Sequence, residues 1–360
     1  MKIWAFTTVR DEEDIIESFV RYNMNVFDGI VISDNCSNDN TLTILKQLKK
    51  EGYNIDILID QNTVFDQTVR RNELLNYTIN KYKPDFIFPI DADEFVCSYK
   101  GQNPRNILEK LDKNYLYKYR MENYILTEND NDDLFIPKKI VSRRKEKEEQ
   151  KCNYKCFISK KNYSKGIFLE IGSHSARCQD GQVLPEVVNP NLYIAHFPVR
   201  SKEQLMNKVI IGRLNHSSFH DRSEEFGFHQ YEILDEIIEK GSISKATLLK
   251  ISKYYSIVDK NISITYSNNP ISLSFCKSID IKYYKGLNKK NVLSNTIKVS
   301  EGIITRLRRE KQEIKNADQK IIREKELERD YYKEELNKIL NSKTWRFKEK
   351  ILRIFGKKRS

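Results

Sequence analysis

The first 95 residues alternate short apolar runs with segments whose apolar residues recur at helical spacing. Strands are predicted at residues 2–8, 29–33, 55–59 and 86–90, and helices at residues 14–25, 41–50 and 65–82. Such alternation predicts an α/β fold, a mostly parallel sheet with helices on both faces. In such sheets ligands bind beyond the carboxyl ends of the strands. The polar residues directly after each strand are therefore the first candidates for function.

The pattern changes twice beyond residue 95. Residues 96–230 mix strand-like runs at 116–120, 157–159 and 192–196 with a charged loop at 143–151. Residues 231–300 begin with a helical pattern and continue into a stretch rich in Asn and Ser. Further on, apolar residues follow alternating spacings of four and three, at Ile303, Leu307, Ile314, Ala317 and Ile321, with Glu310 at one position of the series and no register after Ile321. This rhythm fits a short coiled coil, which would make a homodimer, or a long solvated helix.

The last segment combines an apolar face with a strong positive charge. At about 100° per residue, one half-circle of a helix holds the apolar residues Trp345, Phe347, Ile351, Leu352, Ile354 and Phe355. The other half holds the cations Arg346, Lys350, Arg353 and Lys357. Residues 336–360 carry nine Lys and Arg against one acid, which is +8 of the net +12. We expect an amphipathic helix on an anionic membrane surface, the alternative being a helix docked on its own core.

Composition narrows the class of protein. The chain has 360 residues, 39% of them hydrophobic and 11% aromatic, enough to bury a core without disulfides. No run approaches the ~20 apolar residues of a membrane-spanning helix, and the first residues turn polar too soon for a signal peptide. Six scattered cysteines indicate reduced thiols in a cytosol. Because the positive charge is concentrated in the tail, we expect no nucleic-acid partner.

The strongest chemical signal is the segment 88–95, Phe-Pro-Ile-Asp-Ala-Asp-Glu-Phe, at the end of the fourth strand. Asp91, Asp93 and Glu94 place three carboxylates within four positions, which costs energy unless a cation lies there. Two carboxylates with this spacing suit Mg²⁺ or Mn²⁺ shared with substrate phosphates. The alternative is a solvated acidic turn.

Two further polar clusters follow the first and second strands. Asp34 ends the second strand, where an acid can accept hydrogen bonds from a nucleobase or ribose, while Asp39 or Asn40 would cap the next helix. Thr8, Val9 and Arg10 follow the first strand at the mouth of the same site, and the acids at 11–14 favour the start of a helix.

Together these segments resemble glycosyltransferase family 2, with the GT-A fold, and most closely its bacterial branch with an Asp-Ala-Asp-Glu-Phe motif. The matching segments are 8–13, 34–41, 70–72 and 90–95, and the resemblance covers roughly residues 1–215. It implies that Thr8, Val9, Arg10, Glu12 and Asp34 hold the nucleotide. It also implies that Asp91 binds ribose or metal, that Asp93 binds the metal, and that Arg71 neutralises phosphate.

Histidines and cysteines offer further ligands. His196 resembles a family histidine at a strand end, before a helix containing Lys208, and is a candidate metal ligand or phosphate contact; the alternative is a core histidine. His174 is a weaker candidate of the same kind, and we expect surface or packing roles for His216 and His220. Zinc is disfavoured because no fourth ligand accompanies the three nearest cysteines, Cys152, Cys156 and Cys178.

The general base is the least determined residue. Inverting members of the family use an Asp or Glu, often from a Glu-Asp pair in the second half of the domain, and this chain has no such pair. The candidates are Glu94, Glu170, Asp180 and Glu186. We choose Glu94 because the neighbouring metal ligand Asp93 fixes its position, and both are predicted catalytic residues.

The expected function is metal-dependent transfer of a sugar, with inversion, from a nucleotide-sugar such as a UDP-sugar to a glycan or lipid-linked acceptor in bacterial surface polysaccharide synthesis. The cofactor would be Mn²⁺ or Mg²⁺, and the enzyme would be cytoplasmic, on the inner face of the cell membrane. We expect a GT-A domain at 1–230, an accessory segment at 231–300, a long helix or coiled coil at 301–341 and a basic tail at 342–360. The alternatives are a metal-dependent phosphoryl hydrolase and a non-catalytic peripheral membrane protein.

Overall fold

A computed structural model of the chain describes residues 1–61, 67–145, 153–164, 166–217, 233–257, 261–286 and 291–356. These residues divide into two compact units, Met1–Glu301 and Gly302–Ser360. Phe65, at the predicted start of the third helix, lies outside the described residues, as does most of the charged loop at 143–151.

The described strands are β1 (Ile3–Val9), β2 (Gly29–Asn35), β3 (Ile55–Asp60), β4 (Phe86–Pro89), β5 (Glu94–Ser98), β6 (Leu116–Ile125), β7 (Ser142–Arg144), β8 (Tyr154–Ser159), β9 (Ile167–Leu169), β10 (Ala176–Cys178), β11 (Glu186–His196) and β12 (Tyr266–Asn268). The described helices are α1 (Ile16–Asn23), α2 (Thr41–Lys50), α3 (Gln67–Tyr82), α4 (Pro104–Leu108), α5 (Ile136–Lys139), α6 (Lys160–Tyr163), the short 3₁₀ helix η2 (Ile171–Ser173), α7 (Lys202–Ser217), α9 (Leu234–Lys240), α10 (Lys245–Lys253), α11 (Asn291–Asn341) and α12 (Lys343–Gly356).

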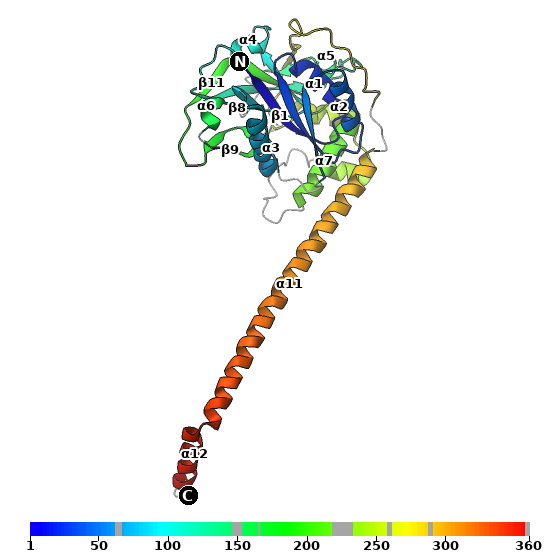
Figure 1. Cartoon of the computed structure of the whole chain (residues 1–360). Coiled ribbons are helices and arrows are strands. Elements are labelled where there is room, and N and C mark those ends of the chain that lie inside the picture. The colour runs from blue at the N-terminus through cyan, green and yellow to red at the C-terminus, as the bar shows by residue number, and fades with distance from the viewer. Residues whose placement is uncertain are drawn as a thin grey trace. The chain divides into compact units, whose positions relative to one another are not determined.

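The N-terminal half of the sheet is parallel, in the order β3-β2-β1-β4. Strand β1 is an almost continuous apolar run because helices cover both of its faces. Ile3 and Ala5 belong to the core beneath α1 and α2, whereas Trp4 and Phe6 belong to the core beneath α3. Figure 1 shows these three helices around β1. Gly29 leaves room for the Trp4 ring, since a Cβ there would lie 2.5 Å from it.

The second half of the sheet adds antiparallel pairs. Strand β8 lies between β4 and β6 and is antiparallel to both. Aromatic rings pack across these strands; the ring centroids of Phe88 and Phe157, for example, lie 4.4 Å apart in a stacked arrangement. Strand β11 then runs parallel to β6 and antiparallel to β5. This register places His196 between Glu94 on β5 and Asn123 on β6. Three distant segments of sequence therefore meet at one point of the sheet.

The described residues of the segment at 231–300 belong to the first unit. Strand β12 extends the sheet by pairing antiparallel to β7. Residues 282–284 then donate three backbone N–H groups to the carboxylate of Glu17 on α1. The first turns of α11 are also anchored here, with Asn295 and Val299 fully buried.

The acids at 11–14 do not cap α1, contrary to the expectation from sequence. The N-cap of α1 is Ile15, which makes no side-chain capping bond. Asp11 instead accepts a hydrogen bond from the backbone N–H of Asn38, and Glu13 accepts one from that of Asn40. The carboxylates therefore tie the loop after β1 to the start of α2, across the carboxyl ends of two strands.

The second unit consists of the rest of α11 and of α12. Within the part of the chain that the structure describes, no helix is both long and apolar enough to cross a bilayer. The predicted fold class is confirmed: an α/β sheet with helices on both faces, followed by a C-terminal helical extension.

Candidate functional site

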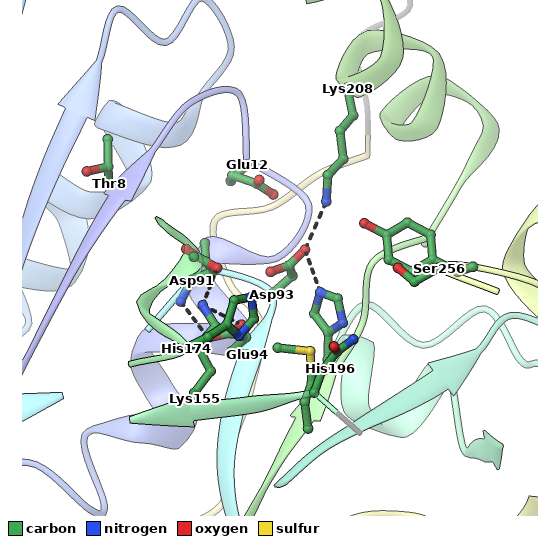
Figure 2. Close-up of a pocket in the computed structure, with 15 residues that line it drawn as sticks. Thr8, Glu12, Asp91, Asp93, Glu94, Lys155, His174, His196, Lys208 and Ser256 are labelled. Carbon is green, nitrogen blue, oxygen red and sulfur yellow. Dashed lines mark hydrogen bonds and ion pairs between the residues drawn. The ribbon is translucent and has the colours of Figure 1, made fainter. Parts of the chain in front are cut away.

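A cavity of about 380 Å³ lies beyond the carboxyl ends of β1 and β4, within the size range of small-molecule sites. Its lining comes from β1, the turn at 91–94, β8, η2, β11, α7 and the loop after α10. Figure 2 shows Asp93 between Lys208 and His196, with Asp91 and Lys155 on the other side. Polar residues that follow β1, β4 and β11 therefore share one pocket.

Asp91 is held by two cations. Arg71, on α3, donates to its Oδ1, and the Nζ of Lys155 lies 2.7 Å from its Oδ2. Burial opposes ionisation of Asp91, but Arg71 and Lys155 outweigh it and hold the pKa of this carboxyl well below its usual range. Lys155 also lies 3.0 Å from Glu94 Oε1, so one buried ammonium pairs with two carboxylates.

Asp93 has a different set of partners on the other side of the turn. Its Oδ2 lies 3.1 Å from Lys208 Nζ, 3.6 Å from His196 Nε2 and 3.7 Å from Arg200 Nη1. Burial would raise the pKa of Asp93, but Lys208, His196 and Arg200 outweigh this effect. The pKa of Asp93 therefore lies well below its usual value. The carboxylate is therefore an ionised acceptor at the pocket wall.

The orientation of His196 is set by the neighbouring strand. Its Nδ1 lies 2.9 Å from Asn123 Oδ1, an atom that can only accept, so Nδ1–H is the donor. Nε2 then faces Asp93 Oδ2, at 3.6 Å. The Lys208 ammonium lies 3.1 Å from the same carboxylate oxygen. The imidazole of His196 and the carboxylate of Asp93 therefore face each other at the pocket wall.

Asp93 and His196 together would offer a divalent cation two ligands from the chain. One imidazole nitrogen and one carboxylate oxygen suit Mn²⁺, with the remaining positions left to substrate phosphates and water. Among the described residues, no three His, Cys, Asp or Glu side chains gather as a metal cluster. Asp91 and Asp93 as metal ligands both stay predictions, because Arg71 and Lys155 pair with the oxygens of Asp91 and Lys208 pairs with Asp93 Oδ2.

Glu94, the predicted base, lies deep in the pocket wall with 1% of its surface exposed. Its Oε2 accepts from the backbone N–H of Asp91, and its Oε1 pairs with Lys155. Burial raises the pKa of Glu94, against the charge of Lys155. The other candidates lie outside the residues that line the pocket: Glu170 pairs with Arg177, Asp180 accepts from Gln182, and Glu186 pairs with Lys118.

The predicted nucleotide residues lie at the ends of β1 and β2. The register of these parallel strands places Thr8 opposite Ser33 and Val9 opposite Asp34. Thr8 Oγ1 and Asp34 Oδ1 are buried without a hydrogen-bond partner in the described structure. Burial raises the pKa of Asp34 and lowers that of Arg10, whose Nη1 lies 3.4 Å from Asn35 Oδ1. Thr8 lines the pocket itself, whereas Val9, Arg10 and Asp34 are not among the residues that line it.

Glu12 reaches the pocket from the loop after β1. Arg200, only 1% exposed, holds it at 2.5 Å and also grips both oxygens of Asp14, at 2.7 and 2.9 Å. Burial raises the pKa of Glu12 to about 8 against the opposing charge of Arg200. Arg200 therefore joins the loop after β1 to the segment after β11.

A tight turn supplies another part of the wall. Gly172 and Ser173 both have positive φ, at 70° and 57°. A Cβ at Gly172 would lie 2.6 Å from His174 Nε2, so only glycine fits. The turn directs Ser173 Oγ to Arg71, at 2.7 Å, and brings His174 to the pocket, where burial lowers its pKa.

Several site residues were not identified from the sequence. Lys155 and Asn123 lie inside apolar strand patterns that carry no motif, and Tyr255 and Ser256 reach the pocket from the accessory segment. Only the tertiary structure brings these four residues to the site. Other candidates lie elsewhere or are not described: Cys156 and Cys178 are buried, Cys152 and His220 lie outside the described residues, and nothing is described of the His216 side chain.

Comparisons with known proteins complete the description. No protein-family model matches this chain. No curated protein matches it either. Similar solved structures include TarS residues 1–349 from S. aureus in complex with UDP, at 12% identity over 70% of this chain and 75% of that one, with a TM-score of 0.33. The mannosyltransferase PcManGT from Pyrobaculum calidifontis, with GDP-Man and Mn²⁺, has 9% identity over 71% and 70%, with a TM-score of 0.35.

A third similar structure is glucosyl-3-phosphoglycerate synthase from Mycobacterium tuberculosis, in complex with Mn²⁺, UDP and glucosyl-3-phosphoglycerate. Identity is 16% over 33% of this chain and 44% of that one, with a TM-score of 0.24. These likenesses concern the chain path and assign no residue or ligand to this protein.

Proposed function

We propose that this protein is a glycosyltransferase of the family 2 type that transfers a sugar from a nucleotide-sugar, a UDP-sugar, to a hydroxyl acceptor. The observation that carries the proposal is the facing pair of Asp93 and His196 in a pocket at the carboxyl ends of parallel strands. The sequence resemblance supports it, because its four motifs come from separate segments and two of them, 8–13 and 90–95, contribute residues to this pocket.

The residues divide the work by position. Thr8, Arg10 and Asp34 bind the nucleoside at the ends of β1 and β2, where Thr8 Oγ1 and Asp34 Oδ1 are buried without a hydrogen-bond partner among the described residues. Asp93 and His196 would hold the divalent cation, which would neutralise charge on the diphosphate leaving group. Lys208 lies 3.1 Å from Asp93 and adds a second positive charge at the same side of the pocket.

The reaction is a single displacement. A bond forms between the acceptor oxygen and the anomeric carbon, the bond from that carbon to the diphosphate oxygen breaks, and the nucleoside diphosphate leaves with the electron pair. A carboxylate, Glu94 in this proposal, takes the acceptor proton. The product has the inverted anomeric configuration, which NMR of the glycosylated product measures; retention would contradict this step. The acceptor we propose is a glycan or lipid-linked precursor of a bacterial surface polysaccharide.

Calorimetric titration tests the site directly. UDP, GDP and CMP are titrated with and without Mn²⁺ into the wild type, Asp93→Ala and Asp318→Ala, an exposed substitution on α11. We expect UDP to bind in the presence of Mn²⁺, with affinity reduced about ten-fold or more in Asp93→Ala and unchanged in Asp318→Ala. The proposal fails if none of the three nucleotides binds to the folded wild type in the presence of the metal.

A further inference from the structure

Helix α12 is a separate element with its own N-terminal cap. It spans Lys343–Gly356, after a break in the helix at Ser342. Ser342 Oγ accepts a hydrogen bond from the backbone N–H of Trp345, at 3.2 Å, which satisfies a donor that the start of the helix leaves free. The tail is therefore organised as a helix rather than as a loose basic extension.

The faces of α12 are sharply different. Trp345, Phe347, Ile351 and Leu352 lie within one half-circle, and the opposite side carries Arg346, Glu349, Lys350 and Arg353. Phe347 is 66% exposed and Leu352 is 60% exposed. Lys348 lies on the apolar side, with its Nζ 5.3 Å from the Trp345 ring, and its long side chain can carry the charge outward.

The charge of the second unit is concentrated at this helix. Residues 301–335 hold ten acids and ten bases, whereas residues 343–356 hold five Lys and Arg against the single acid Glu349. An acidic protein groove or a nucleic acid would match the charge alone. Large apolar side chains beside cations match a lipid surface, whose interior takes the rings while its anionic headgroups take the charges.

We propose that α12 docks on an anionic lipid bilayer, lying in its interface with Trp345, Phe347, Ile351 and Leu352 toward the acyl chains and Arg346, Lys350 and Arg353 at the headgroups. This inference is independent of the reaction at the pocket. It holds or fails on the tail alone.

Trp345 provides a specific probe of this docking. The chain has two tryptophans, and Trp4 is 2% exposed and stacked on Tyr82 in the core. A vesicle-induced change in emission therefore reports on Trp345. We expect the full chain to show a blue shift with vesicles of phosphatidylglycerol and phosphatidylcholine, which high salt reverses, and no shift with phosphatidylcholine alone. Trp345→Phe should lose the fluorescence change while still sedimenting with the anionic vesicles.

Matched variants distinguish vesicle binding by α12 from attraction due to the positive charge of the whole chain. The triple change Arg346→Gln, Lys350→Gln and Arg353→Gln should weaken binding to anionic vesicles, measured by sedimentation, about a hundred-fold, since each headgroup contact contributes about five-fold. The control triple Arg323→Gln, Lys325→Gln and Arg329→Gln removes the same charge from exposed positions on α11 and should leave binding unchanged.

The apolar face has its own test and its own refutation. Phe347→Ser with Leu352→Ser should also weaken vesicle binding, although the charge is unchanged. The proposal is overturned if the wild type shows neither the shift nor sedimentation, if the control triple weakens binding as much as the tail triple, or if the double serine variant binds normally. Tail binding as tight to soluble polyglutamate as to the vesicles would assign the helix to an acidic partner instead.

Discussion

His196 shows how strand register sets the chemistry of a single side chain. The pairing of β11 with β6 places it beside Asn123, and the hydrogen bond between them directs its Nε2 to Asp93. Hydrogen bonds of this kind orient metal-binding histidines in general. If His196 binds a metal, as we propose, Asn123 is the residue that fixes the orientation of its ring.

Asn123→Ala tests this orientation. We expect Mn²⁺ affinity to fall about ten- to a hundred-fold, because the ring loses the acceptor that fixes its tautomer while Asp93 and His196 remain. Electron paramagnetic resonance of free Mn²⁺ measures the change, with Asn129→Ala, at an exposed position, as the control. Unchanged affinity would show that Asn123 does not prepare the ligand.

Lys155 is the second residue of this kind, a buried cation with 2% of its surface exposed. Lys155→Met leaves Glu94 in the wall without its partner, and we expect the free energy of unfolding to fall by about 3–5 kcal/mol. Adding Glu94→Gln should recover part of the loss. Urea denaturation measures the stability of both variants. The control is Lys113→Met, at a half-exposed position, whose free energy of unfolding should stay within about 1 kcal/mol of the wild type. A Lys155→Met protein as stable as the control would contradict this account.

At the scale of elements, Glu17 on α1 fastens a distant segment to the sheet domain. Its buried carboxylate accepts from the backbone N–H groups of Lys282, Tyr283 and Tyr284 and from the guanidinium of Arg21. Glu51, the C-cap residue of α2, pairs with the same Arg21, at 2.8 Å. Two helices and the segment at 282–284 are thereby held by one small network.

Glu17→Ala should release this segment. We expect a loss of about 3–5 kcal/mol in the free energy of unfolding, since Arg21 and three donors lose a buried partner. Hydrogen exchange at 282–284 should accelerate, which separates local release from general loss of stability. Glu73→Ala removes an exposed partner of Arg70 and should cost less than about 1 kcal/mol. Exchange at 282–284 that stays as slow as in the wild type would refute the role of Glu17.

The ion pair of Glu51 with Arg21 predicts that the stability of the protein depends on pH. Its hydrogen bond with Arg21 lowers its pKa to about 2 from the usual 4.5. A carboxyl with a depressed pKa in the folded state stabilises the protein above its unfolded pKa, and this contribution disappears as the pH falls toward 2. In urea titrations, the free energy of unfolding of the wild type should exceed that of Glu51→Gln by about 1 kcal/mol at pH 7. The two values should be equal near pH 2. A difference that is constant with pH would exclude the ion pair as its cause.

At the scale of the whole molecule, α11 leaves the first unit as a 51-residue helix with exposed apolar residues. Leu307, Ile314 and Ile321 are 41%, 62% and 52% exposed, and all three belong to the predicted coiled-coil seam. The seam remains a prediction.

If the seam pairs two copies, light scattering should give twice the 42.7 kDa of the chain. Ile314→Glu with Ile321→Glu should return the protein to the monomer, because charges at seam positions oppose pairing. The exposed Glu313→Gln serves as the control. A wild type that is monomeric at high concentration would contradict the coiled coil.

The sequence by itself determined the local features of this protein. The period of its apolar residues predicted the parallel strands, their helices and the long C-terminal helix, because burial acts along each element separately. Chain order also placed Asp34, Asp91 and Asp93 at strand ends, which is enough to predict that they share one edge of the sheet.

Only the tertiary structure decided which side chains face each other there. The partners of Asp91 and Asp93, Lys155 on β8 and Lys208 on α7, come from segments more than 60 residues away in the chain. Asn123 reaches His196 only through the register of β6 and β11. Strand pairing and ion pairing across such distances depend on the packing of the whole domain, and no local pattern of residues encodes them.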